Sequence, residues 1–398
     1  MDLKSSVAER IDQESKTLIR ISHEMYDHPE LAFEEFRASD LLATALEDGG
    51  IKVERKAYGL DTAFRAVTGV PLGQGLHFIV CAEFDALPDI GHACGHNIIG
   101  TSAVGAGLGL AGVAEDLGIT ITVLGTPAEE SGGGKIELLE AGAFEGADAA
   151  IMVHPAPMDV VDWPTLAWTQ VEVSFHGKES HASAFPEQGL NALDAMTISY
   201  TAVGALRQHI SPTERIHGII THGGDAPNIV PKLTKARYFL RARTADELAP
   251  LKQRVIRCFE GGALAAGCEV EMDWFGKDYD QVVTNHTIGG FYESNLAPLG
   301  RTAIPRSMVE KFAGSTDMGN VSKALPSIHP VMGIDSLPAV NHQADFAAAT
   351  ITAAGDRAIM DAAKAMAWTL IDLATTDGAM DEVRERFANP PADTTLRI

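Results

Sequence analysis

The segment 76–113 constrains the fold most, because it joins a strand, a tight loop and a helix in a short stretch of chain. Residues 76–81 form an apolar run that predicts a buried strand, and the small-residue run 98–113 predicts a packed helix. In the loop between them, one glycine separates Cys94 from His96. A sharp turn could therefore direct a thiolate and an imidazole at one point, and these two groups form a transition-metal ligand set. Metal binding is the first hypothesis for this loop.

The same loop has a plainer interpretation as a glycine-rich turn with a buried thiol, since free cysteine often behaves as a small hydrophobe. Against this stands the density of ionisable groups directly after a strand, where α/β folds place their sites. On this segment alone, both interpretations remain open.

Two later apolar runs also lead to side chains that can bind metals. Residues 119–124 are followed by Glu129 and Glu130 in a glycine-rich segment, and a strand expected at 149–153 leads directly to His154. Strands that alternate with helices predict a parallel sheet, whose C-terminal edge would gather these side chains. If the two glutamates are extended they point opposite ways, so one would bind metal and the other would move protons. Two acids in a glycine-rich surface loop are the plainer alternative.

The pattern changes at the segment 168–277, where alternating strands with one polar face replace the buried runs. Its order is strand, helix, two strands, helix, strand, which is the split βαβ order of an antiparallel sheet with both helices on one face. We therefore expect an α/β fold: a mostly parallel-sheet catalytic domain flanked by helices, 1–167 plus 278–398, with an inserted α+β, ferredoxin-like lid and dimerisation domain at 168–277. We also expect single helices over 5–25 and 345–373.

The composition excludes some classes of partner. The formal net charge is -23 at pH 7, and so acidic a surface repels phosphate backbones and anionic membrane faces. We therefore expect no nucleic acid and no membrane partner, and no apolar run reaches transmembrane length. The first helix is charged rather than a signal peptide, and the four scattered cysteines form no disulfide framework. A cytoplasmic location is expected.

Several motifs, taken in order along the chain, resemble those of peptidase family M20, a family of metallopeptidases. The resemblance is closest to the amidohydrolase branch, subfamily D, and it extends over most of the chain. Asn97 after Cys-Gly-His is similar to the aminoacylase-1-like-2 and p-aminobenzoyl-glutamate hydrolase groups. The matching segments are 82–88, 92–97, 129–130, 154–155, 177–195, 215–220, 226–231 and 314–322.

The resemblance implies a binuclear metal hydrolase. Glu129 matches the general base, and Asp85 matches a carboxylate that orients a metal ligand. Glu83 departs from the aspartate common at its position, which leaves its role open. By pattern alone, His342 fits a helix start or a surface histidine, and only the resemblance makes it a ligand. The metal ligands that the resemblance implies are Cys94, His96, Glu130, His154 and His342.

In the inserted domain, His181 matches a residue that reaches the partner subunit's site in relatives and stabilises the oxyanion. Asn228, Arg241 and Ser315 match substrate-binding positions, the first two near the substrate's carboxylate. An arginine on an alternating strand is more often solvated or paired, but its planar fork would suit a carboxylate if it faces the cleft.

We therefore expect an amidohydrolase or dipeptidase that cleaves the amide bond of a small N-acyl amino acid or dipeptide with a free carboxylate. Two divalent ions, Zn2+ or Mn2+, would lower the pKa of bound water from about 15.7 toward 7 and so supply metal-bound hydroxide. Glu129 would accept the proton and pass it to the leaving amine. The expected partners are this substrate and a second copy of the chain, as a homodimer through the lid domain or a higher oligomer. A hydrolytic deaminase of an aryl amine and a non-catalytic binding protein are the alternatives.

Overall fold

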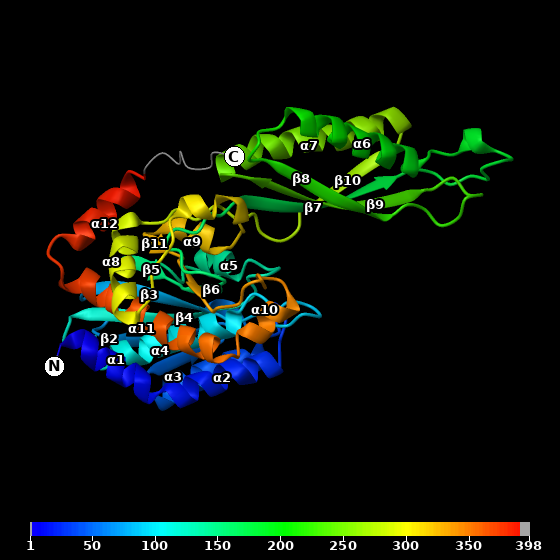
Figure 1. The fold of residues 1–398 in the computed structure, drawn as a ribbon. Coiled ribbons are helices and arrows are strands. Elements are labelled where there is room, and N and C mark those ends of the chain that lie inside the picture. Colours follow the sequence, from blue (N-terminus) through cyan, green and yellow to red (C-terminus); the bar gives the residue numbers. More distant parts are fainter. Residues whose placement is uncertain (1, 391–398) are drawn as a thin grey trace. The chain divides into compact units, whose positions relative to one another are not determined.

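The computed structural model describes residues 2–390, which form two compact units (Figure 1). The first unit runs to Pro164 and resumes at Val282, and the second is Thr165–Gln281. The second unit is thus inserted into the chain of the first. The inserted domain predicted from the sequence spans 168–277.

The first unit is built on a six-stranded sheet with the order β1-β2-β4-β3-β5-β11. Neighbouring strands from β4 to β11 are parallel, whereas β1 and β2 add an antiparallel edge. Every residue of β4 is buried, which is the pattern of a strand covered on both faces. The expected mostly parallel α/β fold is confirmed. The strands are β1 (Lys52–Arg55), β2 (Phe64–Gly69), β3 (Leu76–Glu83), β4 (Ile119–Thr126), β5 (Ala149–Ile151) and β11 (Ser327–Ile328).

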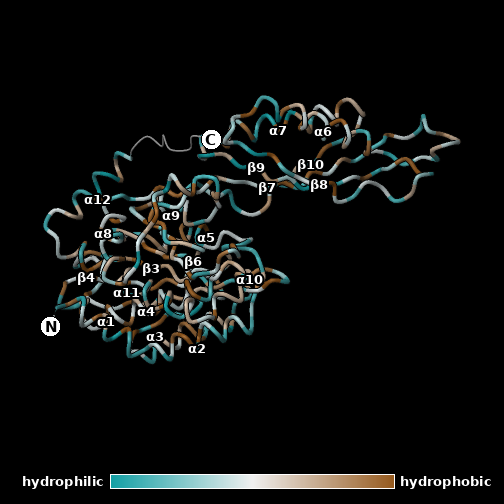
Figure 2. Tube along the Cα trace, viewed as in Figure 1, coloured by the Kyte–Doolittle hydropathy of each residue, from teal (hydrophilic) through white to brown (hydrophobic). Residues whose placement is uncertain are grey.

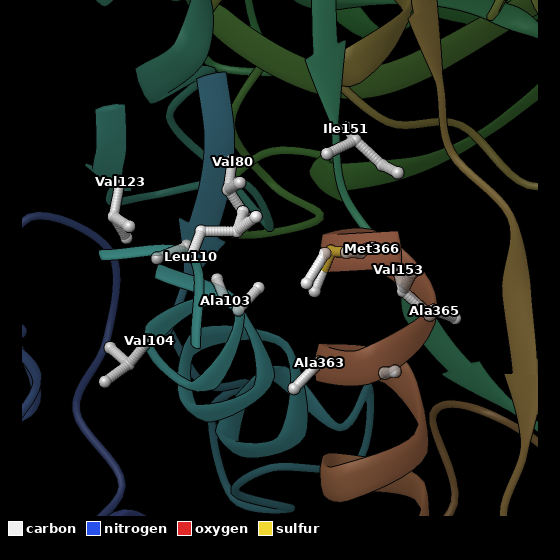
Figure 3. Close-up of a cluster of buried hydrophobic side chains, with 14 of the residues drawn as sticks. Val80, Ala103, Val104, Leu110, Val123, Ile151, Val153, Ala363, Ala365 and Met366 are labelled. Carbon is white, nitrogen blue, oxygen red and sulfur yellow. The ribbon is translucent and has the colours of Figure 1, made fainter. Parts of the chain in front are cut away.

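Helices cover both faces of this sheet, and alternate residues of β3 divide between them. Val80 packs in the larger core with α4 and α11, as Figure 3 shows for its neighbours Val123, Leu110 and Met366. Ile79 points the other way, into a smaller core with α5 and α9. The helices of this unit are α1 (Leu3–Gln13), α2 (Ser15–Asp27), α3 (Phe36–Asp48), α4 (His96–Ala111), α5 (Gly134–Glu140), α8 (His286–Leu296), α9 (Met318–Ala324), α10 (Ala344–Ala349), α11 (Ala353–Thr375) and α12 (Ala379–Ala388).

Three expected elements are divided in the structure. The helix expected over 5–25 is α1 and α2, which meet at Glu14. The helix expected over 345–373 is α10 and α11, because the Thr352 side chain accepts a hydrogen bond from Gly355 N–H and caps a new helix. The strand expected at 149–153 ends early. The chain then forms β6 (His154–Ala156), which pairs with β12 (Val331–Gly333) in a separate sheet.

The second unit has a four-stranded sheet with the order β10-β7-β9-β8, in which every neighbouring pair is antiparallel. Its helices α6 and α7 pack on each other and on this sheet. Val171, Tyr238 and Phe259 belong to its core. Strand, helix, two strands, helix, strand is the order expected from the sequence. The elements are β7 (Ala167–His176), α6 (Ala192–Leu206), β8 (Arg215–His222), β9 (Leu233–Ala242), α7 (Ala245–Ala266) and β10 (Glu269–Asp273).

Hydropathy along the chain follows this architecture (Figure 2). Hydrophobic segments concentrate inside the first unit, and outer helices such as α12 are hydrophilic. Within residues 2–390, no helix is both long enough and apolar enough to span a bilayer.

Candidate metal centre

Three neighbouring strands of the first unit lead to the candidate ligands. The strands lie in the order β4-β3-β5 and are parallel. Cys94 and His96 follow β3, Glu129 and Glu130 follow β4, and His154 begins β6 just after β5. Because the C-terminal ends of parallel strands meet at one edge of a sheet, segments distant in sequence become neighbours there.

Cys94 lies between two groups of candidate ligands. Its Sγ is 3.4 Å from Nε2 of His154 and 3.5 Å from Nε2 of His342. The Nε2 of His342 is in turn 3.8 Å from Oε1 of Glu130. One group is Cys94, His96 and His154, and in it the ligand atoms lie within 4.8 Å of one another. Cys94, Glu130 and His342 form the second group by the same measure. One sulfur thus belongs to both groups, as a ligand shared by two ions would.

Unpaired buried atoms show that these residues fit a metal. Nε2 of His96 and Oε1 of Glu130 have no hydrogen-bond partner within the described part of the chain. Leaving such atoms without a partner costs free energy, which a bound cation would offset. The other ring nitrogen of His96 hydrogen-bonds to Asp85, so Nε2 is the nitrogen available for a metal. A sulfur, imidazole and carboxylate set suits zinc and other divalent transition metals.

Two buried carboxylates hold the loops that carry the ligands. Asp85 accepts a hydrogen bond from Nδ1 of His96 at 2.9 Å through one oxygen, and from Glu130 N–H at 2.9 Å through the other. Glu35, which the sequence analysis missed, accepts from Ala128 N–H at 2.8 Å. These bonds set the direction in which His96 and Glu130 point.

Glu129 and Glu130 lie in a turn after β4 rather than on an extended strand, and Ala128 before them has a φ of 60°. The two side chains nevertheless join different groups: Glu130 meets Cys94 and His342, whereas Glu129 meets Glu83 and His96. Glu129 is buried, which contradicts the surface-loop alternative. Burial and the neighbouring carboxylates Glu83 and Glu130 raise the pKa of Glu129 well above its usual value. A carboxylate with a raised pKa suits proton transfer near neutral pH.

The protonation of the other candidate ligands follows from their burial. Burial, together with the Glu130 carboxylate, raises the pKa of the Cys94 thiol well above its usual value. Burial lowers the pKa of His154 to about 3, so its ring is neutral at physiological pH. A metal ligand must be a thiolate or a neutral imidazole, so metal binding would release the thiol proton.

The Asn341 side chain joins the loop after β3 to β6. Asn341 donates from Nδ2 to the carbonyl oxygens of Pro155 at 3.2 Å and Cys94 at 3.4 Å. Gly95 has a φ of 86°, and a Cβ on it would overlap the Pro155 ring. Nothing in the local sequence pattern indicates that Asn341 joins these two segments.

A buried ion cluster borders the site and was missed by the sequence analysis. Lys135 is fully buried and pairs with Glu83 and with Asp317. The available signal was a lysine at the start of a short apolar helix, directly after a run of glycines. Ser315, predicted to bind substrate, is partly buried and lies just before this Asp317.

The remaining predicted site residues belong to the second unit. His181 is exposed, and Ala182 N–H donates to the carbonyl oxygen of Asn228 at 3.0 Å, so these segments are neighbours. The Arg241 guanidinium lies 5.8 Å from the centre of the Trp168 ring. Burial lowers the pKa of Arg241. The substrate-binding roles of these residues stay predictions.

An α/β unit whose strand ends gather two candidate ligand groups around one cysteine is the arrangement expected of a metal-dependent enzyme. Residues 79–366 match the family model of Peptidase family M20/M25/M40, and the chain belongs to this family. The resemblance seen in the sequence and the assignment as an enzyme are thus confirmed.

Curated relatives and solved structures agree with this assignment. The chain is 40% identical over 397 residues to the Xaa-Arg dipeptidase of Mus musculus, a match that covers 97% of this chain and 92% of the relative. It is 32% identical over 316 residues to one subunit of the p-aminobenzoyl-glutamate hydrolase of Escherichia coli K12, covering 74% of this chain and 65% of that one. A dinuclear metal binding peptidase of the M20 family from Bacillus subtilis has the same fold, with a TM-score of 0.71 and 21% identity over 92% of this chain and 99% of that one.

Proposed function

We propose that the protein hydrolyses the amide bond of a dipeptide or small N-acyl amino acid with a free carboxylate, using two divalent ions. The observation that carries this proposal is the pair of ligand groups that share Cys94, with Glu129 beside them. Zinc or manganese would suit the donors, since thiolate favours zinc and the carboxylates and imidazoles admit manganese.

Different residues of the chain would have different roles in the hydrolysis. Bound divalent ions would polarise the amide carbonyl and make hydroxide available near neutral pH. Glu129 would accept the proton of the attacking water and deliver it to the leaving amine, for which its burial and raised pKa suit it. Asp85 would hold His96 in the tautomer that presents Nε2.

A dipeptide with a C-terminal arginine is the first substrate to test. Its support is the 40% identity to a protein named Xaa-Arg dipeptidase, together with the net charge of -23, which favours cationic molecules. The relative named p-aminobenzoyl-glutamate hydrolase supports an N-acyl glutamate as the second.

Substrate contacts in the second unit, assembly and location belong to the same proposal. His181 would stabilise the oxyanion, and Asn228, Arg241 and Ser315 would bind the substrate, with the first two near its carboxylate. A homodimer through the second unit and a cytoplasmic location are likewise proposed, on the family resemblance and the composition respectively.

The test is the release of free amino acid from four probes: an Xaa-Arg dipeptide, a β-alanyl dipeptide, an N-acyl amino acid and p-aminobenzoyl-glutamate. Each is assayed with and without chelator, and the best dipeptide is repeated with its C-terminus amidated. We expect chelator-sensitive turnover that the amidated probe loses. Ammonia release from aryl amines alone would instead support the deaminase, and protein inert after zinc or manganese is added would support the binding protein.

A further inference from the structure

The carboxylate of Glu83, at the end of β3, faces a candidate metal ligand without a hydrogen bond. Its Oε1 lies 3.0 Å from Nε2 of His96, and both side chains are fully buried. Neither atom has a hydrogen-bond partner among residues 2–390. Asp85 engages Nδ1 of His96 at 2.9 Å, so Nε2 is the ring nitrogen that faces Glu83. The two atoms lie at ion-pair distance, so a proton on His96 or a metal cation bound to both could occupy the space between them.

The other oxygen of Glu83 is already engaged. Nζ of Lys135 pairs with Oε2 of Glu83 and with Oδ1 of Asp317, the latter at 2.8 Å. The backbone N–H of Lys135 donates to Oδ2 of Asp317 at 2.9 Å. Lys135 is therefore held at two points, and it leaves only Oε1 of Glu83 available on the side of His96.

The charges of this cluster do not balance within it. Glu83, Lys135 and Asp317 are all fully buried, and the two carboxylates share one ammonium group, so the cluster is neutral only if the neighbouring His96 is protonated. A buried net negative charge is costly unless a cation compensates for it. A divalent ion on the His96 side of Glu83 would supply that compensation.

We propose that Glu83 is a fourth protein ligand of the ion held by Cys94, His96 and His154, and that this ion is the more tightly bound of the two. Sulfur, two imidazole nitrogens and a carboxylate oxygen complete a four-coordinate set, which is typical of closed sites. Both groups around Cys94 have three members, and Glu83 lies with His96 and Glu129 in a third group that shares His96 with the first. Glu83 would therefore join the first ion through its position beside His96, whereas the group of Cys94, Glu130 and His342 would keep three protein ligands. Sites with three protein ligands keep a position open for water or substrate.

The solvent exposure of the two ligand groups agrees with this difference in metal affinity. The side chain of His342 is 59% exposed, whereas His96 and Glu83 are fully buried. Water and chelator reach an exposed ligand more readily than a buried one. The ion beside His342 is therefore expected to dissociate first.

The experiment measures metal content instead of turnover. Purified full-length protein is loaded with zinc, dialysed against graded concentrations of chelator, and analysed for metal by elemental analysis. The parent protein is expected to lose its two equivalents in two separate steps. In Glu83→Gln, the tighter equivalent should be lost at a chelator concentration at least tenfold lower than in the parent. This is the effect usual for an altered metal environment.

A second variant distinguishes ligation from charge alone. Glu83→Asp keeps the negative charge but is one methylene shorter, so its carboxylate should not reach the ion, and it should behave like Glu83→Gln. Glu214→Gln removes a buried carboxylate in the second unit and should keep both steps. His342→Ala should remove the weaker equivalent and leave the tighter one. Loading with a single equivalent of cobalt gives an independent readout, because that ion should occupy the tighter site and its thiolate absorption should change in both Glu83 variants.

Two results would overturn the inference. If both Glu83 variants keep the parent's two steps, Glu83 is not a ligand. If only Glu83→Asp keeps the two steps of metal loss, the negative charge of Glu83 stabilises the ion without coordinating it. Circular dichroism checks the fold of each variant, and Glu83→Asp carries the test alone if Glu83→Gln does not fold. The inference rests on the metal site of the proposed function. Protein that takes up no metal would contradict that function, whereas two unchanged steps would contradict only the role of Glu83.

Discussion

Asp85 accepts a hydrogen bond from Nδ1 of His96 at 2.9 Å, and both side chains are buried. The second oxygen of Asp85 accepts from the backbone N–H of Glu130. His96 belongs to one ligand group and Glu130 to the other. A single carboxylate therefore sets the orientation of both groups.

Asp85→Asn should weaken metal binding by about 10- to 100-fold, the usual effect of removing the partner of a ligating histidine. The two bonds reach different oxygens of Asp85, and asparagine replaces one of these oxygens with an NH2 donor, so one bond is lost in this geometry. Chelator competition measures the effect. Asp335→Asn, in an exposed ion pair with Arg357, is the control and should bind metal as the parent does. Unchanged affinity in Asp85→Asn would contradict the orienting role.

Glu129→Gln should lower kcat by about 10²- to 10⁴-fold while metal content stays unchanged, because the variant loses a proton acceptor and not a ligand. Glu130→Gln is the matched comparison. Glu130 meets Cys94 and His342, so this neighbouring change should reduce metal content as well as turnover. Amino acid release and elemental analysis on the same samples separate the two effects. Parallel loss of metal and activity in Glu129→Gln would remove it as the base.

Gly95→Ala should lower the free energy of unfolding by about 1–3 kcal/mol, the cost of a strained backbone conformation. Gly95 has a φ of 86°, and its added Cβ would overlap the Pro155 ring, so Cys94 and His154 should also separate. Urea denaturation and zinc affinity measure the two consequences. Gly112→Ala, with a φ of -76° and open space around it, is the control at the other end of α4. Equal stability of the two variants would show that the close approach is not needed.

Glu35→Gln should flatten the pH dependence of stability between about pH 4.5 and 7. Burial and the nearby Asp85 carboxylate raise the pKa of Glu35 from 4.5 to about 7. The folded protein therefore holds this proton more tightly than the unfolded chain. The contribution of Glu35 is fully present below pH 4.5 and is lost as pH rises through about 7.

A shift of this size corresponds to about 3 kcal/mol. Denaturation at pH 5 and pH 8 gives the difference in unfolding free energy for each protein, and it should be smaller in Glu35→Gln than in the parent. Glu54→Gln, an exposed glutamate, should behave as the parent does. An unchanged difference in Glu35→Gln would show that Glu35 does not titrate in this range.

Local sequence was enough to predict much of the fold and part of the site. Apolar runs such as 119–124 predicted buried strands, because both faces of a central strand must be apolar. Their alternation with helices predicted a parallel sheet, and a parallel sheet brings its strand ends together. Cys94 and His96 could also be paired from the sequence, because a single glycine between them cannot place them far apart.

Contacts between distant segments were decided only by the tertiary structure. His342 is 248 residues from Cys94, and its pattern alone fits a surface histidine; it is exposed and yet turned toward the Cys94 sulfur. Lys135 and Asp317 are 182 residues apart, and no local periodicity indicates that they pair. Periodicity reports which face of an element is buried, but not which element covers it. That choice depends on strand order and packing, which also placed Glu83 against His96.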